Sequence, residues 1–310
     1  MDGRAPGLVD IAELNAAYAV CRTIARREAK NFYYAFVALP KPKRNAICAV
    51  YAFMRQADDL ADDESVSVDE RHKRLSAWIA GWRAASAGGE TSDPVFIALL
   101  DAMVRFEIPL SLLDELVAGV TMDLDCANGN APDTYATFED LYKYCYLVAS
   151  VVGLVCIRIF GYTDVRAEKL AEETGIAFQL TNILRDVADD AERNRVYLPL
   201  VDLKAHGVEL ESILHREKNA APTSRERALL KYIGRLAETY YKSGQALMPL
   251  INKESRPALW VLVSIYHALL KRIERADFDV FSKRVSVPLR EKLFILVVGL
   301  TRMMWVRLVG

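Results

Sequence analysis

Helical periodicity is the feature that most limits the fold of this chain. It recurs from residue 10 to the end, and strand patterns are scarce. Pro109 and Pro257 fit first-turn positions, and Gly161 fits a helix stop. Thr137 with Asp140 fits a capping box. The sequence therefore predicts an all-α fold, with helices near residues 10–30, 41–63, 68–87, 94–106, 110–126, 138–160, 164–191, 223–250, 256–276 and 288–308.

The length and linkers of the chain indicate one domain. Of its 310 residues, 52% are hydrophobic, so the chain can bury a large core. The candidate linkers, 126–135 and 216–224, are short and polar, and no long hinge rich in Pro, Gly and Ser divides the chain. We expect a single domain over residues 1–310.

Charge and cysteine usage exclude several kinds of partner. Lys and Arg total 40 against 41 Asp and Glu, so no overall basic field would attract nucleic acid. The five cysteines contain no CxxC pair, and no two His residues have metal-ligand spacing, which indicates neither a zinc site nor a disulfide framework. The N-terminal stretch lacks the apolar core of a signal peptide. We expect a cytoplasmic protein.

The C-terminal helix carries an apolar stretch, 293–301, followed by Arg302 and Arg307. This stretch is too short to span a bilayer, which takes about 20 residues. Packing as an ordinary terminal helix is the interpretation that we favour. The alternative is a peripheral contact with the inner membrane through Trp305 and the flanking arginines.

The segment QADDLADDE, residues 56–64, collects five acidic side chains at the end of an apolar helical run. Like charges one turn apart repel, and the C-terminus of a helix disfavours anions. On a helical wheel four side chains fall within about 60° of one another: Tyr51, Arg55, Asp58 and Asp62. Asp59 and Asp63 turn away by about 100°. We call Asp58 and Asp62 the first acidic row.

A second acidic row, Asn182, Asp186 and Asp190, lies in the segment QLTNILRDVADDAERNRVYLP, residues 179–199. These side chains are spaced one helical turn apart, within about 80° on one face. The same face continues through Gln179, Phe178, Gly175 and Ala171. A polar carboxylate tip that runs into a small apolar wall is typical of a helix that lines a pocket.

Either row alone has a structural explanation, as a solvated helix face or through ion pairs with Arg55 and Arg185. Two matching rows favour a shared function, because Mg²⁺ typically binds one or two carboxylates together with substrate phosphate oxygens. Arg55, Arg185, Arg193 and Arg195 suit bidentate phosphate contacts.

An allylic diphosphate that departs leaves a carbocation, which apolar and aromatic walls must shield from water. The candidate wall residues, each of which has an ordinary core position as its alternative, are Phe32, Phe36, Tyr51, Tyr144, Phe178 and Tyr266.

Five segments carry a resemblance: NFYYAFVALP (31–40), YAFMRQADDLADD (51–63), VTMDLD (120–125), YCYLVASVVG (144–153) and QLTNILRDVADDAERNRVYLP (179–199). Together and in this order they resemble the squalene/phytoene synthase family, over about residues 15–285. The resemblance implies an α-helical isoprenoid synthase fold with a central cavity. It also implies head-to-head joining of two prenyl diphosphates through a cyclopropylcarbinyl diphosphate, with two or three Mg²⁺ ions.

The resemblance also implies roles for single residues. Asp58 and Asp62 match the family's first metal motif, and Asn182, Asp186 and Asp190 match the second. Residues that match the diphosphate region are Tyr51, Arg55, Gln179, Arg185 and Tyr197. Tyr144 and Tyr266 match tyrosines near the reacting carbons, and chain length depends on cavity residues such as Val148, Ala149, Val151 and Phe178.

Two substrate contacts follow less directly from the resemblance. Asn31, beside Phe32, stands where the family often has Ser, which leaves the donor-side phosphate contact open. In FSKRVSVPLREK, residues 281–292, Arg284 is our choice for a phosphate-contacting arginine, with Lys283 as the alternative.

Within the family, the chain looks most like the bacterial presqualene diphosphate synthases of hopanoid biosynthesis, which condense two farnesyl diphosphates. Phytoene synthases, which use geranylgeranyl diphosphate, and squalene or dehydrosqualene synthases are the alternatives. NADPH is not expected, but family members that use it bind it without a GxGxxG motif, so the absence of that motif decides little. A non-catalytic relative that serves as a binding module is a further alternative, which the complete acidic rows disfavour. The oligomeric state stays open.

Overall fold

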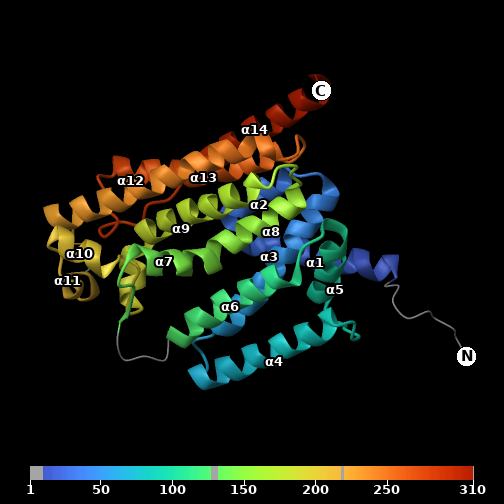
Figure 1. Ribbon diagram of the computed structural model, residues 1–310, viewed down its shortest axis with the longest axis horizontal. Helices are drawn as coiled ribbons and strands as arrows, with labels where there is room; N and C mark the ends of the chain where they lie inside the picture. The colour runs from blue at the N-terminus through green and yellow to red at the C-terminus, as the bar shows by residue number, and fades with distance from the viewer. Residues whose placement is uncertain (1–9, 127–131, 218–219, 310) are drawn as a thin grey trace, which may run out of the picture.

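The structure of the protein is a computed structural model that describes residues 10–126, 132–217 and 220–309. Figure 1 shows a bundle whose long helices run roughly along its longest axis. The helices are α1 (Ile11–Glu28), α2 (Lys30–Val37), α3 (Lys41–Ala61), α4 (Val68–Ser86), α5 (Pro94–Phe106), α6 (Leu110–Cys126), α7 (Phe138–Cys145), α8 (Val151–Phe160), α9 (Arg166–Glu192), α10 (Leu200–His206), α11 (Leu210–Leu214), α12 (Ser224–Leu247), α13 (Arg256–Arg275) and α14 (Leu289–Val309). The predicted all-α class is confirmed.

Local signals explain where several helices begin and end. Thr137 and Asp140 form the predicted capping box of α7. Pro257 occupies the first turn of α13, whereas Pro109 lies just before α6 begins at Leu110. Gly161 ends α8 with a φ of +77°, a backbone conformation that is unfavourable for residues with a side chain.

The structure adds elements that the periodicity did not predict. The segments α2, α10 and α11 are helices of eight, seven and five residues, too short to establish a hydrophobic period. The expected helix 138–160 contains a π-helical turn, Tyr146–Ser150, between α7 and α8. A two-residue parallel pairing joins β1 (Asp133–Thr134) to β2 (Arg195–Val196), in the register Asp133 to Arg195.

The core surrounds α9. This helix packs against α8, the π-helical turn, α12 and α13, and α12 is its most extensive neighbour. One large cluster of buried side chains extends from Ala17 in α1 to Ile295 in α14. In Figure 1, α12, α13 and α14 lie along one long side of the bundle and α4 along the other, with α9 between them. The second acidic row therefore sits on a helix that is held from several sides.

Close helix packing at the π-helical turn depends on Gly175 of α9. A Cβ atom there would lie 2.6 Å from Ser150 Cα and 2.8 Å from Ala149 O. Both are backbone atoms, so they cannot move aside as the end of a flexible side chain would.

Two further observations concern membranes and thiols. Among the described residues, one helical stretch, Phe138–Phe160, is long and apolar enough to cross a membrane, and 44% of its most apolar window is buried inside the protein. Core helices pass the same test. Cys21, Cys48, Cys145 and Cys156 are free thiols, and the side chain of Cys126 lies outside the described part.

We expect Gly175→Ala to lower the free energy of unfolding by about 1–3 kcal/mol, because the added methyl group overpacks a backbone contact. The change is measured by thermal and urea unfolding of the full chain. The matched control is Gly81→Ala, an exposed position inside α4 where a Cβ meets only a Phe96 side-chain atom at 3.8 Å. That variant should gain about 0.5–1 kcal/mol from helix propensity. Equal behaviour of both variants would contradict this account of the packing.

Candidate active site

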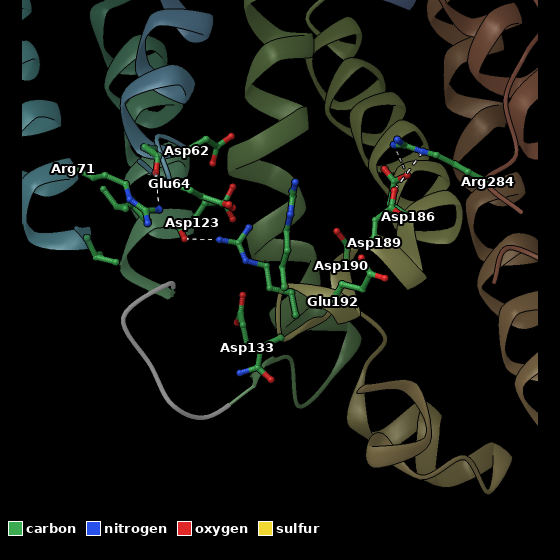
Figure 2. Close-up of a pocket in the computed structure, with 16 residues that line it drawn as sticks. Asp62, Glu64, Arg71, Asp123, Asp133, Asp186, Asp189, Asp190, Glu192 and Arg284 are labelled. Atoms are coloured by element: carbon green, nitrogen blue, oxygen red, sulfur yellow. Dashed lines mark hydrogen bonds and ion pairs between the residues drawn. The ribbon is translucent and has the colours of Figure 1, made fainter. Parts of the chain in front are cut away.

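A polar cavity of about 760 Å³ opens where the C-terminal ends of α3, α6 and α9 meet. Figure 2 shows Asp62, Glu64 and Asp123 on one side of it, with Asp186, Asp189 and Asp190 on the other. Asp62 of the first acidic row and Asp186 and Asp190 of the second thus face one space, although more than a hundred positions separate the rows in the sequence. Asp58 is not among the lining residues, and Asn182 lines a second cavity. The residues that line the polar cavity are Ala61, Asp62, Glu64, Val68, Arg71, Asp123, Leu124, Asp133, Asp186, Asp189, Asp190, Glu192, Arg193, Asn194, Arg195 and Arg284.

The first acidic row lies at the end of α3. Asp62 is the C-cap residue, and its backbone N–H donates to Asp58 O at 2.8 Å. Burial, and then the charge of Asp62, raises the pKa of Asp58 to about 7. The neighbouring Arg55 forms its ion pair with Asp59, at 2.5 Å. Among the described residues, no side chain forms an ion pair with Asp58 or Asp62.

The second acidic row lies on α9, as its spacing predicts. Burial, and then the charge of Asp186, raises the pKa of Asp190 to about 7. Asp186 itself is held by two arginines: Arg185 Nε donates to its Oδ1 at 2.8 Å, and Arg284 Nη2 donates to the same oxygen at 2.7 Å. The ion-pair explanation raised from the sequence thus holds for Asp186 but not for Asp190.

Asp123 is an acidic residue of this cavity that the sequence analysis did not assign to the site. Burial raises its pKa to about 6, with the nearby charge of Asp62 adding to the effect. Arg195 Nη2 donates to its backbone carbonyl at 2.9 Å. The sequence signal that could have identified Asp123 is the segment VTMDLD. It places acidic side chains at the end of a predicted helix, as the segments that contain the two acidic rows also do.

Three tyrosines, Tyr135, Tyr144 and Tyr197, pack against one another near Asp123. Tyr144 and Tyr197 stack with ring centroids 4.9 Å apart, and the Tyr144 hydroxyl donates to that of Tyr197 at 3.2 Å. Tyr135 stacks on Tyr197 at 5.8 Å. Burial raises the pKa of Tyr144 well above its usual value, so its hydroxyl stays protonated at neutral pH.

A second, apolar cavity of about 100 Å³ lies among α8, α9 and α13. Val148, Gly175 and Phe178 line it, as the sequence analysis expected of a pocket wall. Val151 is buried and is not one of the lining residues. The full set is Phe32, Val148, Ala149, Val152, Gly153, Cys156, Ile157, Phe160, Ala171, Thr174, Gly175, Phe178, Gln179, Asn182, Leu247, Leu259, Leu262 and Tyr266.

Aromatic rings and amides gather at one end of the apolar cavity. Phe178 stacks on Tyr266 with centroids 4.4 Å apart, and Phe32 lies 5.5 Å from Tyr266. Gln179 and Asn182 are the polar amides of this cavity. Because Asn182 belongs to the same face of α9 as Asp186 and Asp190, α9 leads from the apolar cavity to the acidic one.

The remaining expected substrate contacts are placed as follows. Tyr51 lies beside Phe36 with centroids 6.1 Å apart, and burial raises its pKa to about 12. Arg284, rather than Lys283, reaches the acidic cavity; Lys283 lines a neighbouring one. The side chain of Asn31 lies outside the described residues.

The side chains fit divalent cations that bind together with a substrate. In the described part of the chain, no three His, Cys, Asp or Glu side chains are close enough to hold a metal by themselves. However, Asn182 Oδ1 is buried without a hydrogen-bond partner, and burial raises the pKa values of Asp58 and Asp190 although the charges of nearby arginines act in the opposite direction. Hard oxygen ligands in this state suit Mg²⁺ completed by phosphate oxygens.

Acidic rows beside an apolar cavity in a helical bundle suit a substrate with an anionic head and a hydrocarbon tail. Residues 25–291 match the squalene/phytoene synthase family, so the chain belongs to that family of prenyltransferase-type enzymes, which have the isoprenoid synthase fold. This confirms the resemblance at the level of the family.

Relatives and solved structures agree with this assignment. A 15-cis-phytoene synthase of Synechococcus elongatus is 33% identical over 94% of this chain and 95% of its own length. A phytoene synthase of Mycobacterium tuberculosis is 33% identical over 89% of this chain and 88% of its own length. A crystal structure of a dehydrosqualene synthase in complex with a ligand is 29% identical, with a TM-score of 0.81, over 95% of this chain and 99% of that chain. The squalene synthase HpnC of Alicyclobacillus acidocaldarius is 28% identical, with a TM-score of 0.77, over 87% of this chain and 97% of that chain.

The raised pKa of Asp58 predicts a pH-dependent gain in stability for Asp58→Asn in metal-free protein. The folded state binds a proton at Asp58 up to about pH 7, whereas an unfolded Asp loses it near 3.8. The ionised carboxylate therefore destabilises the fold increasingly between these values, and fully above them. We expect the variant to match the parent at pH 4 and to exceed it by up to about 4 kcal/mol at pH 8, because each pKa unit corresponds to about 1.4 kcal/mol.

The measurement is urea unfolding in the presence of a chelator across that pH range. Asp69→Asn is the matched control, because Asp69 is an exposed acid in the first turn of α4. A stability difference for Asp58→Asn that does not grow with pH would contradict the assigned burial.

Proposed function

We propose that this protein joins two prenyl diphosphates head to head and releases one diphosphate to form a cyclopropylcarbinyl diphosphate. The single observation that carries the proposal is that α9 presents carboxylates to the polar cavity and Phe178, Gln179 and Asn182 to the apolar one. A molecule with an anionic head and a hydrocarbon tail matches this pair of cavities. Membership of the squalene/phytoene synthase family supports the same chemistry.

The residues that would hold Mg²⁺ are Asp58, Asp62, Asn182, Asp186 and Asp190. When bound, Mg²⁺ supplies positive charge against the leaving diphosphate. Arg185 and Arg284 already donate to Asp186, and their remaining N–H groups are suited to phosphate oxygens. A carboxylate oxygen has more than one lone pair, so these contacts and a metal contact are compatible at Asp186.

The carbocation that remains after ionisation would be enclosed by the apolar cavity, with the ring faces of Phe178 and Tyr266 beside it. Tyr266, which lines this cavity, is proposed to lie near the reacting carbons; Tyr144, the other tyrosine expected there, lines neither cavity and stacks on Tyr197 instead. Burial raises the pKa of Tyr266 to about 12, so its phenol is neutral at pH 7. A neutral phenol is a poor base, and we therefore assign the proton lost on ring closure to the released diphosphate.

Two chain lengths are candidates, each with its own support. The likeness to a dehydrosqualene synthase and a squalene synthase favours farnesyl diphosphate and a presqualene diphosphate product. The likeness to the phytoene synthases of Synechococcus elongatus and Mycobacterium tuberculosis favours geranylgeranyl diphosphate at least as strongly. Either chain needs more space than 100 Å³, because drug-sized ligands occupy about 300–1,000 Å³. Substrate entry therefore requires side chains of this cavity to move.

Product analysis tests the proposal. Purified full-length protein is incubated with Mg²⁺ and either farnesyl or geranylgeranyl diphosphate, with and without NADPH, and the products are separated by mass. We expect a cyclopropyl diphosphate or the hydrocarbon derived from it, and a chelator should abolish its formation. The preferred substrate distinguishes the presqualene candidate from the phytoene candidate.

Asp58→Ala and Asp186→Ala should each lower turnover by at least about a thousandfold, while circular dichroism shows unchanged helix content. Asp69→Ala, on the surface of α4, is the control and should keep full activity. Unchanged product formation in both active-site variants would refute the catalytic assignment and favour the non-catalytic alternative.

We also propose that α14 contacts a membrane surface. Its inner face packs on α13 and α2, which agrees with an ordinary terminal helix. Its outer face exposes four large apolar side chains, Leu289, Leu293, Phe294 and Val297. The helix contains Arg290, Lys292, Arg302 and Arg307 against the single acid Glu291, so its net charge is positive and suits an anionic lipid surface.

The double variant Leu293→Ser with Phe294→Ser should bind anionic vesicles at least about tenfold more weakly, because each apolar side chain contributes about 1.5–3 kcal/mol when it leaves water. Co-sedimentation of the full chain with such vesicles measures the change. Val104→Ser is the control, since Val104 is 84% exposed on α5, away from α14. Equal binding by all three proteins would rule out α14 as the contact.

A further inference from the structure

Arg284 reaches the acidic cavity from a segment without helix or strand. Residues 276–288 connect α13 to α14, and the Arg284 side chain is 59% exposed, so its own packing restrains it little. Its Nη2 nevertheless donates to Asp186 Oδ1 at 2.7 Å, and its Nε lies 3.5 Å from Asp189 Oδ2. The position of this arginine must therefore come from the backbone that carries it.

Two phenylalanines anchor that backbone. Asp277 and Phe278 have positive φ angles of 51° and 58°, a conformation that costs roughly 1–2 kcal/mol per non-glycine residue. The Phe278 ring fills the space above Gly234 of α12, where a Cβ would lie 2.8 Å from its Cε1. Phe281 is also buried, at 6% exposure, three residues before Arg284.

The face of Phe281 is covered by Arg216, whose guanidinium carbon lies 3.9 Å from the ring centroid. Arg216 is fixed in turn by protein groups on the other side. Its Nη1 donates to Glu226 Oε1 at 2.7 Å, and its Nε and Nη2 donate to the carbonyls of Ala220 and Ala221. A guanidinium with these partners has little freedom to leave the ring.

Glu226 connects this contact to the start of α12. It is 3% exposed, and its Oε2 accepts from the Thr223 N–H at 2.7 Å in the capping box of the helix. Burial opposes ionisation of Glu226, but the contacts with Arg216 and Thr223 outweigh it and leave its pKa below the usual value. Arg216 and Glu226 thus form a largely buried ion pair. Removing one partner would leave the other charge unpaired, which lowers stability strongly.

We propose that Arg216 is a positioning residue for diphosphate recognition: by holding Phe281 through its face, it fixes segment 279–284 so that Arg284 stays at Asp186. Arg216 does not line the acidic cavity; it lines a neighbouring cavity of about 320 Å³ that Arg185, Asp189, Phe281 and Arg284 also line. Because each of its guanidinium nitrogens already donates to a protein group and its flat face lies on Phe281, it acts through the segment and not on the substrate. This inference rests on the proposed function, in which Arg284 contacts the diphosphate.

The test uses the full-length protein with Mg²⁺ and measures competitive inhibition by inorganic diphosphate. Phe281→Leu keeps an apolar side chain but removes the ring face, and it should weaken inhibition about tenfold. Phe281→Tyr keeps the face and should stay within about twofold of the parent. Phe138→Leu is the matched control: it removes a partly buried ring that packs on Tyr142 and Tyr240, and it should leave the inhibition constant unchanged.

A double-mutant cycle with Arg284→Ala separates positioning from general destabilisation. If Arg216 and Phe281 act through Arg284, Phe281→Leu adds less than about twofold once Arg284 is Ala. Effects that multiply in the double variant would overturn the proposal, as would an unchanged inhibition constant for Phe281→Leu alone. Should Phe281→Leu fail to fold, Arg216→Lys, which keeps the charge but loses the flat guanidinium, takes its place in the same cycle.

The cycle also distinguishes this inference from the proposed function. If Arg284→Ala by itself leaves inhibition by diphosphate unchanged, the assigned role of Arg284 is wrong, and the positioning proposal falls with it. Loss of product formation in Asp58→Ala and Asp186→Ala would still support the prenyl transfer reaction in that case.

Discussion

Desolvation of carboxylates near the ends of three helices is the constraint on which the rest of this structure depends. Asp58 of α3, Asp123 of α6 and Asp190 of α9 are each partly buried, and burial is the main cause of the raised pKa of each. A fold selected for stability alone would not gather them, because taking a charge out of water is expensive. The extensive packing of α9 against α12 and α13 supplies the rigid support that such an arrangement requires. The cost of placing these acids together is one that Mg²⁺ bound with a diphosphate, as proposed above, would relieve.

The sequence predicted the parts of the site that lie on long helices. Spacing by one turn is a local property, so Asn182, Asp186 and Asp190 could be placed on one face before any tertiary information was available. The continuation of that face into Phe178 and Gly175 was predictable for the same reason. The resemblance then identified the family correctly, but its finer choice of presqualene over phytoene chemistry is not confirmed, because similar relatives are phytoene synthases. The preferred chain length depends on the depth of the cavity, which a local sequence pattern does not predict.

What the sequence did not predict is mostly non-local. Asp123 enters the site because α6 ends beside α3, and Arg216 meets Phe281 across sixty-five positions of chain. The short helices α10 and α11 and the pairing of Asp133 with Arg195 were missed, because segments of so few residues show no hydrophobic periodicity. In Figure 1, α10 and α11 lie at one end of the bundle, close to the start of α7. Connections that look like loops in sequence therefore help to build the polar end of the molecule.

The π-helical turn Tyr146–Ser150 adds one residue to a helix that otherwise continues from α7 into α8. Each residue of an α-helix advances by about 100° around its axis, so this single insertion sets the rotation of everything that follows it. Tyr144 before the turn belongs to the tyrosine group beside Asp123, while Val152 and Cys156 after it face the apolar cavity. Shortening the turn by one residue would keep the composition of the helix but rotate its downstream half, so that the cavity would be lined by a different set of side chains. Relatives that differ in length at this point could thus differ in hydrocarbon preference without any substitution on the cavity wall.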